Sequence, residues 1–302
     1  MNPKKLLILL PFIVLFVGCI KDDDTDDGPC STSSTLYFSY MGDGLTELFP
    51  AKISTVWLYV FNTDNALVTE LSIDRTQLSA YQGTQLTLPQ GQYHVVCWGN
   101  TFGKTMDKNA MGRITAELSN PDYEAGGVVT TNDSLYYAYR LLTVPAVPEK
   151  TDTIHFQGAH IKFRVFLHGA YTSATPTRAN PSAYYIRVNQ LPPTYDFSMK
   201  NLQLPIAYKP VGAEETEAVT AKPMFAYRFN SLRIADDNPV TIDIIDVQTD
   251  KVVYTLSLKD YMALYGIHVN GIHEAIINVH FVISSVGITV LPWQDEDIHP
   301  EV

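Results

Sequence analysis

Three cysteine thiols are the side chains of this chain best suited to covalent chemistry. Cys19 follows an apolar run, Cys30 lies in a polar segment, and Cys97 lies inside the strand-like run Tyr93–Trp98. A cysteine can carry a lipid or join a second thiol in a disulfide, and its surroundings and compartment decide between these fates. The three cysteines are therefore expected to have different chemistry.

The segment before Cys19 has the features of a secretory signal. Two lysines precede an apolar run over residues 6–17. This run is too short to cross a bilayer, because a spanning helix needs about 20 apolar residues. It ends in Leu-Phe-Val-Gly-Cys, which resembles a bacterial lipobox with Phe16 where leucine is usual. We expect residues 1–18 to be removed as a lipoprotein signal peptide and Cys19 to carry acyl chains. Ordinary secretion and a retained helix are the alternatives.

Charged residues just after Cys19 form a second signal. Lys21-Asp22-Asp23-Asp24 resembles the lipoprotein export signal of Bacteroidota, which directs lipoproteins to the outer face of the outer membrane. The alternative is a solvated spacer, which is what most acidic runs are. A calcium loop is disfavoured, because an EF-hand needs alternating oxygen ligands and a later glutamate at fixed spacing. The sequence therefore predicts a surface-exposed lipoprotein of the outer membrane.

Cys30 and Cys97 remain as an even pair in an oxidising compartment. A disulfide between them would tie the membrane tether to the first domain and would stabilise the fold by roughly 2–4 kcal/mol. The alternative is two unpaired thiols, one of them buried as a small hydrophobic side chain. We favour the disulfide.

No residue pattern predicts catalysis, a metal or a cofactor. The histidines show no HExxH and no other tight ligand spacing, and those in strand-like runs are interpreted as structural. A Gly-x-Ser-x-Gly nucleophile elbow is missing from the sequence. Asp236 and Asp237 adjoin Asn238-Pro239 and are typical of a turn. The chain is therefore predicted not to be an enzyme. The eight histidines are His94, His155, His160, His168, His268, His273, His280 and His299.

Composition narrows the class of protein further. The chain has 302 residues, a net charge of -11 and a pI of about 5.1. Nucleic-acid binding is disfavoured, because it requires basic surfaces. The 18 tyrosines, with recurring threonine and valine, suit pleated and half-buried strands.

The pattern of short alternating runs and turns predicts an all-β protein with two tandem β-sandwich domains. We expect a flexible acidic tether over residues 19–35, a first sandwich over 36–148 and a second over 149–302, with the boundary at the proline-rich stretch 144–150. Thr153–Phe156 is expected to open the second domain. Hairpins are expected at 56–61 with 67–73 and at 240–247 with 252–258, and helical spacing is fair only over 258–265.

Three aromatic side chains share one face of an expected strand, namely Trp57, Tyr59 and Phe61. We interpret them as core. A carbohydrate platform is the alternative and would need the same rings to be exposed.

Several short motifs follow one another in an order that is more distinctive than any one of them. After the lipobox and the acidic stretch come Gly28-Pro29-Cys30, Leu58–Asn62, the run Leu86–Tyr93 that leads to Cys97-Trp98-Gly99, and Ile288–Trp293. In this layout nearly the whole chain resembles the FimB-type fimbrillin-associated anchor family of Bacteroidales.

The resemblance implies two transthyretin-like β-sandwiches in a lipoprotein at the base of a fimbria. It also implies two partners: major fimbrial subunits bound by β-strand complementation, and the outer membrane bound through the lipid on Cys19. Strand complementation is β-augmentation, in which main-chain hydrogen bonds give affinity and side-chain pockets give register. Because only the acidic tail 295–302 follows the last motif, we expect this chain to accept a strand or present an edge rather than to donate a strand.

The predicted function is that of a lipid-anchored fimbrial subunit. It would attach a fimbria to the outer membrane, limit its length and contribute to cell adhesion. The alternative is a surface glycan-binding lipoprotein of a nutrient uptake system, which exposed tryptophan or tyrosine rings on one face would favour. A surface hydrolase has no supporting motif.

Overall fold

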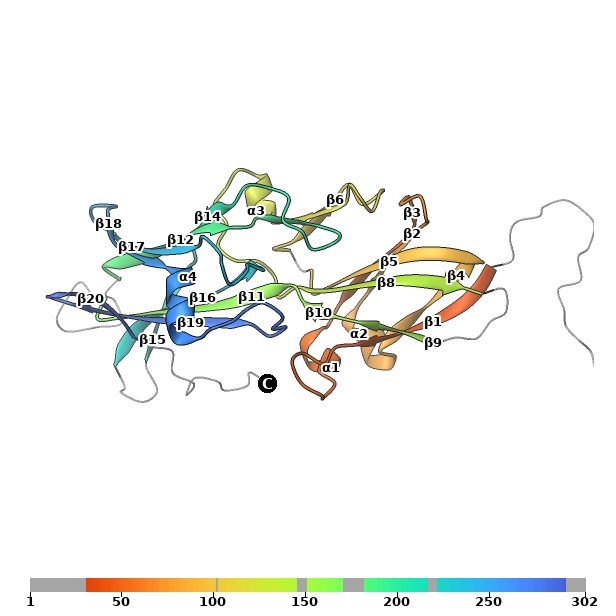
Figure 1. Ribbon diagram of the computed structural model, residues 1–302, viewed down its shortest axis with the longest axis horizontal. Helices are drawn as coiled ribbons and strands as arrows, with labels where there is room; N and C mark the ends of the chain where they lie inside the picture. Colours follow the sequence, from red (N-terminus) through yellow and green to blue (C-terminus); the bar gives the residue numbers. More distant parts are fainter. Residues whose placement is uncertain (1–30, 102, 146–150, 171–181, 217–221, 292–302) are drawn as a thin grey trace, which may run out of the picture.

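The computed structural model describes residues 31–101, 103–145, 151–170, 182–216 and 222–291. Strands dominate it and form several sheets, which confirms the predicted all-β class. The described chain is elongated, and its N-terminal and C-terminal halves lie at opposite ends of the long axis (Figure 1). No helix in this part of the chain is long and apolar enough to cross a membrane.

Two facing sheets make up the N-terminal half. Their strands are β1 (Ser31–Ser39), β2 (Val56–Phe61), β3 (Leu67–Ile73), β4 (Gly83–Pro89), β5 (Gly91–Gly99), β8 (Tyr136–Val144), β9 (Thr151–His155) and β10 (Gln157–Gly158). One sheet has the order β4-β1-β9 and the other the order β10-β8-β5-β2-β3. Two short helices, α1 (Phe49–Lys52) and α2 (Arg75–Ala80), lie beside them.

The core of this half lies between the two sheets. Alternate side chains of each strand point inward, as the period of two in a strand requires. Leu36 and Phe38 of β1 meet Leu58 and Val60 of β2 in one apolar cluster, and all four are fully buried. Burial of such side chains contributes about 1.5–3 kcal/mol each, before conformational entropy is subtracted.

Strand β1 begins earlier than the sequence predicted. Residues 31–35 were assigned to the tether, yet they pair with β4, where Ser31 lies opposite Pro89 and Thr35 opposite Gln85. The polar composition of this segment was misleading, because pairing with a neighbouring strand outweighs the low strand propensity of its serines. The tether can therefore extend no further than residue 30.

Strand β9 corrects the predicted position of the second domain. Thr153–Phe156 was expected to open that domain, but β9 pairs in parallel with β1 and belongs to the N-terminal half. Strand β10 then pairs with β8, so the chain leaves this half only after Gly158. A parallel partner more than a hundred residues away in the chain leaves no local signal in the sequence. The two-domain, transthyretin-like description stays a prediction.

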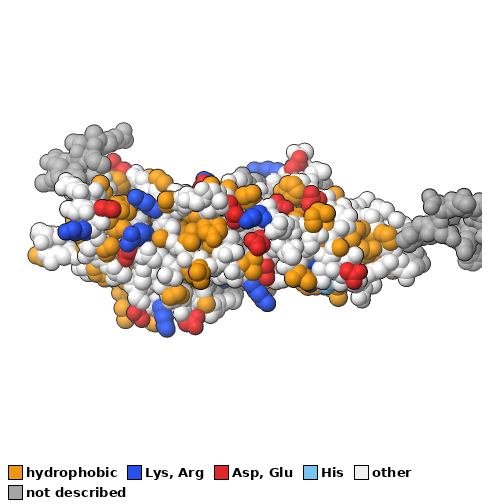
Figure 2. Space-filling view, turned by 90° about the horizontal axis from the view of Figure 1, so that it is seen from above, with side chains coloured by type: hydrophobic (Ala, Val, Ile, Leu, Met, Phe, Trp, Pro, Cys, Tyr) orange, Lys and Arg blue, Asp and Glu red, His pale blue; other side chains and the backbone are white. Residues whose placement is uncertain are grey.

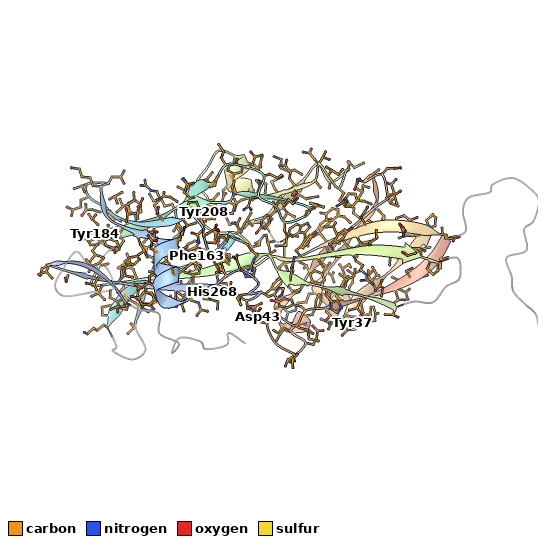
Figure 3. The ribbon with its side chains drawn as sticks, in the orientation of Figure 1. Tyr37, Asp43, Phe163, Tyr184, Tyr208 and His268 are labelled. Atoms are coloured by element: carbon orange, nitrogen blue, oxygen red, sulfur yellow. The ribbon has the colours of Figure 1, made fainter. Side chains whose placement is uncertain are left out.

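Two further sheets form the C-terminal half. Their strands are β11 (His160–His168), β12 (Tyr184–Leu191), β14 (Ile206–Tyr208), β15 (Gly212–Thr216), β16 (Pro223–Leu232), β17 (Thr241–Asp246), β18 (Val252–Ser257), β19 (Ile276–Ser284) and β20 (Gly287–Leu291). The sheet orders are β15-β16-β11-β19-β20 and β14-β12-β17-β18. Figure 3 labels Phe163 and Tyr208, which come from different sheets and share the core of this half.

The predictions that rest on patterns of neighbouring residues are confirmed. Both expected hairpins are present, as β2 with β3 and as β17 with β18. Helix α4 (Leu258–Tyr265) covers the predicted range. The Ser257 side chain caps its first turn, and Gly266 ends it with a φ of 65°, a left-handed conformation that favours glycine.

A third apolar cluster joins the two halves. A small sheet of order β13-β7-β6 contributes to it, with β6 (Met106–Lys108), β7 (Glu117–Ser119) and β13 (Thr194–Asp196). A third helix, α3 (Pro121–Glu124), follows β7. Tyr59 and Phe61 of β2 pack there against Phe197, with ring centroids 4.9 and 6.1 Å apart. The interpretation of these aromatic side chains as core is confirmed for Tyr59 and Phe61, whereas Trp57 is half-buried.

Candidate functional site

The residues predicted to carry the lipid and the export signal lie outside the described residues. These are Cys19, Lys21, Asp22, Asp23 and Asp24. Strand β1, the first described strand, begins at one end of the long axis of the described chain (Figure 1). Any attachment through the N-terminal segment would therefore pull on the tip of the N-terminal half.

The predicted Cys30–Cys97 disulfide also stays a prediction, because Cys30 lies outside the described residues. Cys97 is completely buried and its thiol is free. Burial raises the pKa of this thiol well above its usual value, which keeps it protonated and unreactive. Ser31 pairs with Pro89, next to the start of β5, whereas Cys97 lies near the end of that strand.

His160 has the structural role that the sequence predicted. Its ring lies in the junction between the halves, and Nδ1 is 2.9 Å from the carbonyl oxygen of Leu135. Burial lowers the pKa of His160 to about 4, and the hydrogen bond to Leu135 opposes this only in part. Among the described residues, no group of three or more histidine, cysteine, aspartate or glutamate side chains could hold a metal ion.

Most sheet edges in the described structure carry a feature that blocks strand addition. Charged side chains, proline and short length are the common protections of an edge strand. Glu70 lies in β3, Pro89 ends β4, Asp152 lies in β9, and Glu214 and Glu215 lie in β15. The remaining outer strands of the four main sheets, β10 and β14, are two and three residues long.

Two outer strands of the C-terminal half have none of these protections. Within the described chain β18 pairs only with β17, and β20 pairs only with β19. Val252–Ser257 and Gly287–Leu291 contain no charged residue and no proline. Val253 and Leu291 are 47% and 37% exposed. Such strands present unpaired main-chain donors and acceptors together with apolar side chains.

The two unprotected edges border the same side of the C-terminal half. The Tyr254 ring of β18 packs edge-on against Phe281 of β19, the neighbour of β20, with centroids 5.9 Å apart. Ile288 and Val290 of β20 are half-buried against the same core. Figure 1 shows β18 and β20 at the end of the molecule opposite the start of β1. We call β18 and β20 together the open side.

A polar network holds the junction between the halves. The Glu274 carboxylate accepts hydrogen bonds from the Tyr40 and Tyr136 hydroxyls, and it lies 3.6 Å from Lys52 Nζ and 3.5 Å from Lys162 Nζ. Burial would raise the pKa of Glu274, but the Tyr40 hydrogen bond and the two lysines outweigh burial and lower it. The carboxylate is therefore ionised and satisfied at neutral pH.

A second carboxylate extends this network across the junction. Asp43, which Figure 3 labels between the halves, accepts the backbone N–H groups of His273 at 2.7 Å and Glu274 at 2.9 Å. Hydrogen bonds to a charged acceptor are about twice as strong as neutral ones. The aromatic cluster and this network together connect the two halves.

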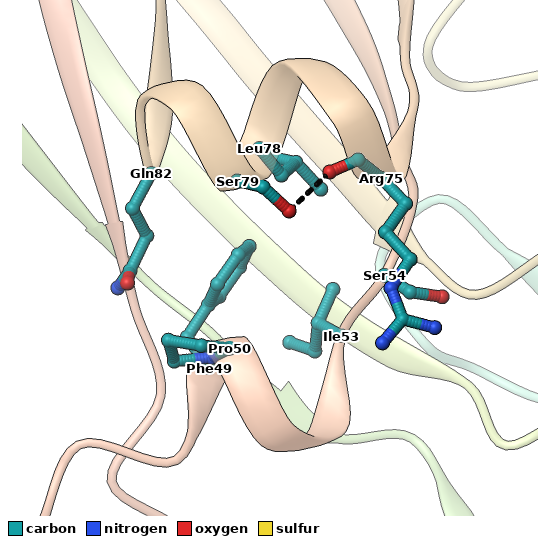
Figure 4. A pocket seen from close by; sticks show the side chains of 8 residues that line it. All are labelled: Phe49, Pro50, Ile53, Ser54, Arg75, Leu78, Ser79 and Gln82. Atoms are coloured by element: carbon teal, nitrogen blue, oxygen red, sulfur yellow. Dashed lines mark hydrogen bonds between the residues drawn. The ribbon is translucent and has the colours of Figure 1, made fainter.

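Two of the cavities in the described structure fit no ligand well. One holds about 90 Å³ between α1 and α2, where Phe49, Ile53 and Leu78 form an apolar wall (Figure 4). It is far below the roughly 300–1,000 Å³ of ordinary ligand pockets. The other holds about 530 Å³ at the junction and is lined by three lysines. Each of them is paired with a carboxylate, so it offers no surplus positive charge: Lys52 and Lys162 with Glu274, and Lys104 with Asp122.

Comparison with known families identifies this architecture. The profile of the fimbrillin-A associated anchor proteins Mfa1 and Mfa2 matches residues 25–299. The chain belongs to this family. The family resemblance predicted from the sequence is therefore confirmed. No curated protein sequence gives a significant match.

Solved structures of several bacterial proteins share the fold. The fimbrial anchor protein Mfa2 of Porphyromonas gingivalis is 15% identical, with a TM-score of 0.63, over 87% of this chain and 98% of that one. A candidate polysaccharide-binding protein of Bacteroides thetaiotaomicron VPI-5482 is 16% identical, with a TM-score of 0.68, over 88% and 99%. A candidate adhesin of the same organism is 15% identical, with a TM-score of 0.69, over 89% and 98%.

Sequence reasoning missed Glu274, Asp43 and the two open edges. The absence of charge in 252–257 and 287–291 is visible in the sequence, but which strands are outermost is not. Glu274 follows His273 in a stretch without a motif. Only the fold brings it against Tyr40, more than two hundred residues earlier in the chain.

Proposed function

We propose that this protein attaches a fimbria to the outer membrane, through a lipid on Cys19 at one end and the open side at the other. Family membership supports a role in fimbrial anchoring and adhesion. The observation that carries the finer proposal is that β18 and β20 are the two long outer strands without a charge or proline in the described structure. In this account the protein is structural and catalyses no reaction.

The partner at the open side is a strand of a major fimbrial subunit. An added strand would pair its main chain with the outer edge of β18 or β20, and its alternate side chains would face the core. Tyr254 of β18 and Val290 of β20 are half-buried at this edge and offer apolar contacts for such side chains. Strand addition would thus satisfy unpaired backbone groups and cover apolar surface at once.

The N-terminal half offers no site at which a further subunit could add to β1. Strand β1 is paired on both sides, antiparallel to β4 and parallel to β9, and therefore offers no edge to a further subunit. Leu36 and Phe38 fix it in the core. Such a subunit binds the fimbria only at its open side, and its N-terminal end is held in the membrane. It therefore terminates the polymer, which accounts for a limit on fimbrial length.

The junction between the halves suits this arrangement. A force on the fimbria would act on the protein at the open side and be transmitted to the membrane through β1. The contact between the halves must therefore bear this force. The aromatic cluster around Tyr59 and Phe197, with the Glu274 and Asp43 network, lies on this path. The hydrogen bonds to the half-buried Glu274 and the exposed Asp43 cross this contact and oppose separation of the halves.

The test uses cells that lack the gene and cells that carry Cys19→Ala. Fimbriae are imaged on the cells, and pilin is assayed in the culture fluid. The proposal predicts shed or abnormally long fibres in both strains. Normal attached fibres in both would contradict it and would favour the glycan-binding alternative. Shedding in the deletion strain alone would show that the protein anchors the fimbria without the lipid.

A further inference from the structure

A third cavity lies where β2, β5 and the β6–β7 hairpin meet. It holds about 220 Å³. The share of one water molecule in the liquid is about 30 Å³, so the cavity is several waters large, yet it is below the roughly 300–1,000 Å³ of drug-sized pockets. It could hold a single ring of a small ligand. Trp57, Tyr59, Trp98, Thr101, Thr105 and Asp107 are among the residues that line it.

Unpartnered polar atoms are concentrated at this cavity. In the described residues seven buried side-chain nitrogen or oxygen atoms lack a hydrogen-bond partner, and three belong to its lining: Trp98 Nε1, Thr101 Oγ1 and Thr105 Oγ1. Trp98 is fully buried and Thr105 is 8% exposed. A buried donor or acceptor without a partner is costly, so such groups are rare unless a ligand or water completes them. Their clustering here points to a missing hydrogen-bonding partner.

One wall of the cavity is aromatic, where Trp57 of β2 lies beside Trp98 of β5. The half-buried Trp57 ring stacks on Tyr59, with centroids 6.3 Å apart and planes inclined by 22°. The Tyr59 hydroxyl donates to Asp107 Oδ2 at 3.0 Å. Burial and the Asp107 carboxylate raise the pKa of this hydroxyl, so it stays protonated. The exposed Asp107 is thereby held at the cavity, where its carboxylate can accept further hydrogen bonds.

We propose that this cavity binds one neutral pyranose sugar. A pyranose has an apolar C–H face that suits the Trp57 ring, and hydroxyl groups that both donate and accept hydrogen bonds. Such hydroxyls match the Trp98 N–H, the Thr101 and Thr105 hydroxyls, and the Asp107 carboxylate. The carboxylate and the net charge of -11 disfavour an acidic sugar. The inference goes beyond the anchor role and does not depend on it.

The size of the site explains why it is expected to bind one ring only. The same pyranose could be a free sugar or the end of a longer glycan, and a comparison of methyl pyranosides with an oligosaccharide that ends in the same sugar separates these sources. Equal affinity would indicate that the terminal ring alone is recognised. Tighter binding of the oligosaccharide would place the source in a longer glycan.

The experiment is a tryptophan fluorescence titration of the full chain in a detergent without sugar groups. Two of the three tryptophans of the chain line the cavity, so they report directly on its occupation. The probes are the methyl pyranosides of glucose, galactose, mannose and N-acetylglucosamine, with glucuronic acid as the matched acidic control. We expect saturable quenching or enhancement by at least one neutral sugar and a markedly smaller response to glucuronic acid.

Two variants separate ligand binding from a structural role. Thr105→Val keeps the shape and removes an unpartnered hydroxyl, so the Tm of the free protein should be unchanged or higher while sugar affinity falls at least tenfold. Thr87→Val is the matched control, because Thr87 is exposed on β4 in the other sheet of the N-terminal half. The proposal is overturned if no neutral pyranoside binds the native protein, in which case the cavity holds ordered water only. It is equally overturned if Thr105→Val binds sugar as well as Thr87→Val does.

Discussion

The two halves of the molecule differ in how many of their sheet edges are protected. In the N-terminal half every outer strand is short or carries a charge or a proline, and β1 has partners on both sides. In the C-terminal half β18 and β20 are long, uncharged and partnered on one side only within the described chain. An open edge invites pairing with another chain, and natural proteins usually protect it. In the proposed function, this difference separates a closed N-terminal half from a C-terminal half that receives a partner.

Charged side chains of both signs occur in both halves. On the face that Figure 2 shows, acidic and basic side chains are interspersed over the left and middle of the molecule, and few charged side chains lie at its right-hand end. This mixture shows no broad basic patch on that face, and the net charge of the chain is -11. The contrast between the halves therefore lies in their strand edges. Variants in each half and at the junction should differ in how strongly they change the stability of the protein.

The largest effect is expected in the closed half. Phe38→Ala removes a fully buried ring that contacts Phe49 and Phe156, with centroids 5.8 and 5.7 Å apart. The free energy of unfolding should fall by about 3–5 kcal/mol. Guanidinium unfolding should show one transition that shifts as a whole, because the junction couples the halves. Two transitions of which only one moves would contradict that coupling. Tyr81→Ala, at a 42% exposed ring, is the control.

The junction should be sensitive to acid through His160. The folded-state pKa of about 4 lies below the usual value of 6.5, so unfolding takes up a proton between these values. The stability is complete above pH 6.5, and up to about 3 kcal/mol of it is lost as the pH falls towards 4. His160→Gln cannot titrate and should flatten the stability profile in this window. An unchanged slope, measured by denaturation at several pH values, would show that His160 is not the group responsible.

Glu274→Gln tests the same junction at neutral pH. The change removes the charge that Lys52 and Lys162 share, while the shape of the side chain is kept. The stability should fall by about 1–3 kcal/mol. Glu70→Gln on the exposed edge of β3 is the matched control and should stay within about 0.5 kcal/mol of the native protein. Equal stabilities of the two variants, measured by thermal unfolding, would rule out a central role for Glu274.

The sequence predicted what short-range patterns determine. The alternation in 240–247 and 252–258 was enough for a hairpin, and the apolar spacing in 258–265 was enough for α4. The start of β1 at Ser31 could not be predicted, because polar residues become a strand there only through β4. The parallel pairing of β9 with β1 is equally long-range.

Some candidate sites could likewise be predicted from neighbouring residues, whereas others depend on tertiary contacts. The segment around Cys19 is a local motif and could be recognised from the sequence alone. The open side requires knowledge of which strands are outermost, and the sugar cavity requires that Trp57, Trp98 and Thr105 meet across two strands and a loop. These arrangements follow from tertiary contacts, which one sequence does not display.

The most direct test of the account places a charge on the open side. Val253→Lys and Thr289→Lys put lysine on exposed positions of β18 and β20, where stability should change by less than about 0.5 kcal/mol. Val68→Lys on β3 is the matched control, at a 44% exposed valine of an already protected edge. The measurement is the fraction of pilin that remains bound to cells carrying each variant. The account predicts release of pilin into the culture fluid from the Val253→Lys, Thr289→Lys double variant and normal retention with Val68→Lys. Equal retention in both strains would contradict it.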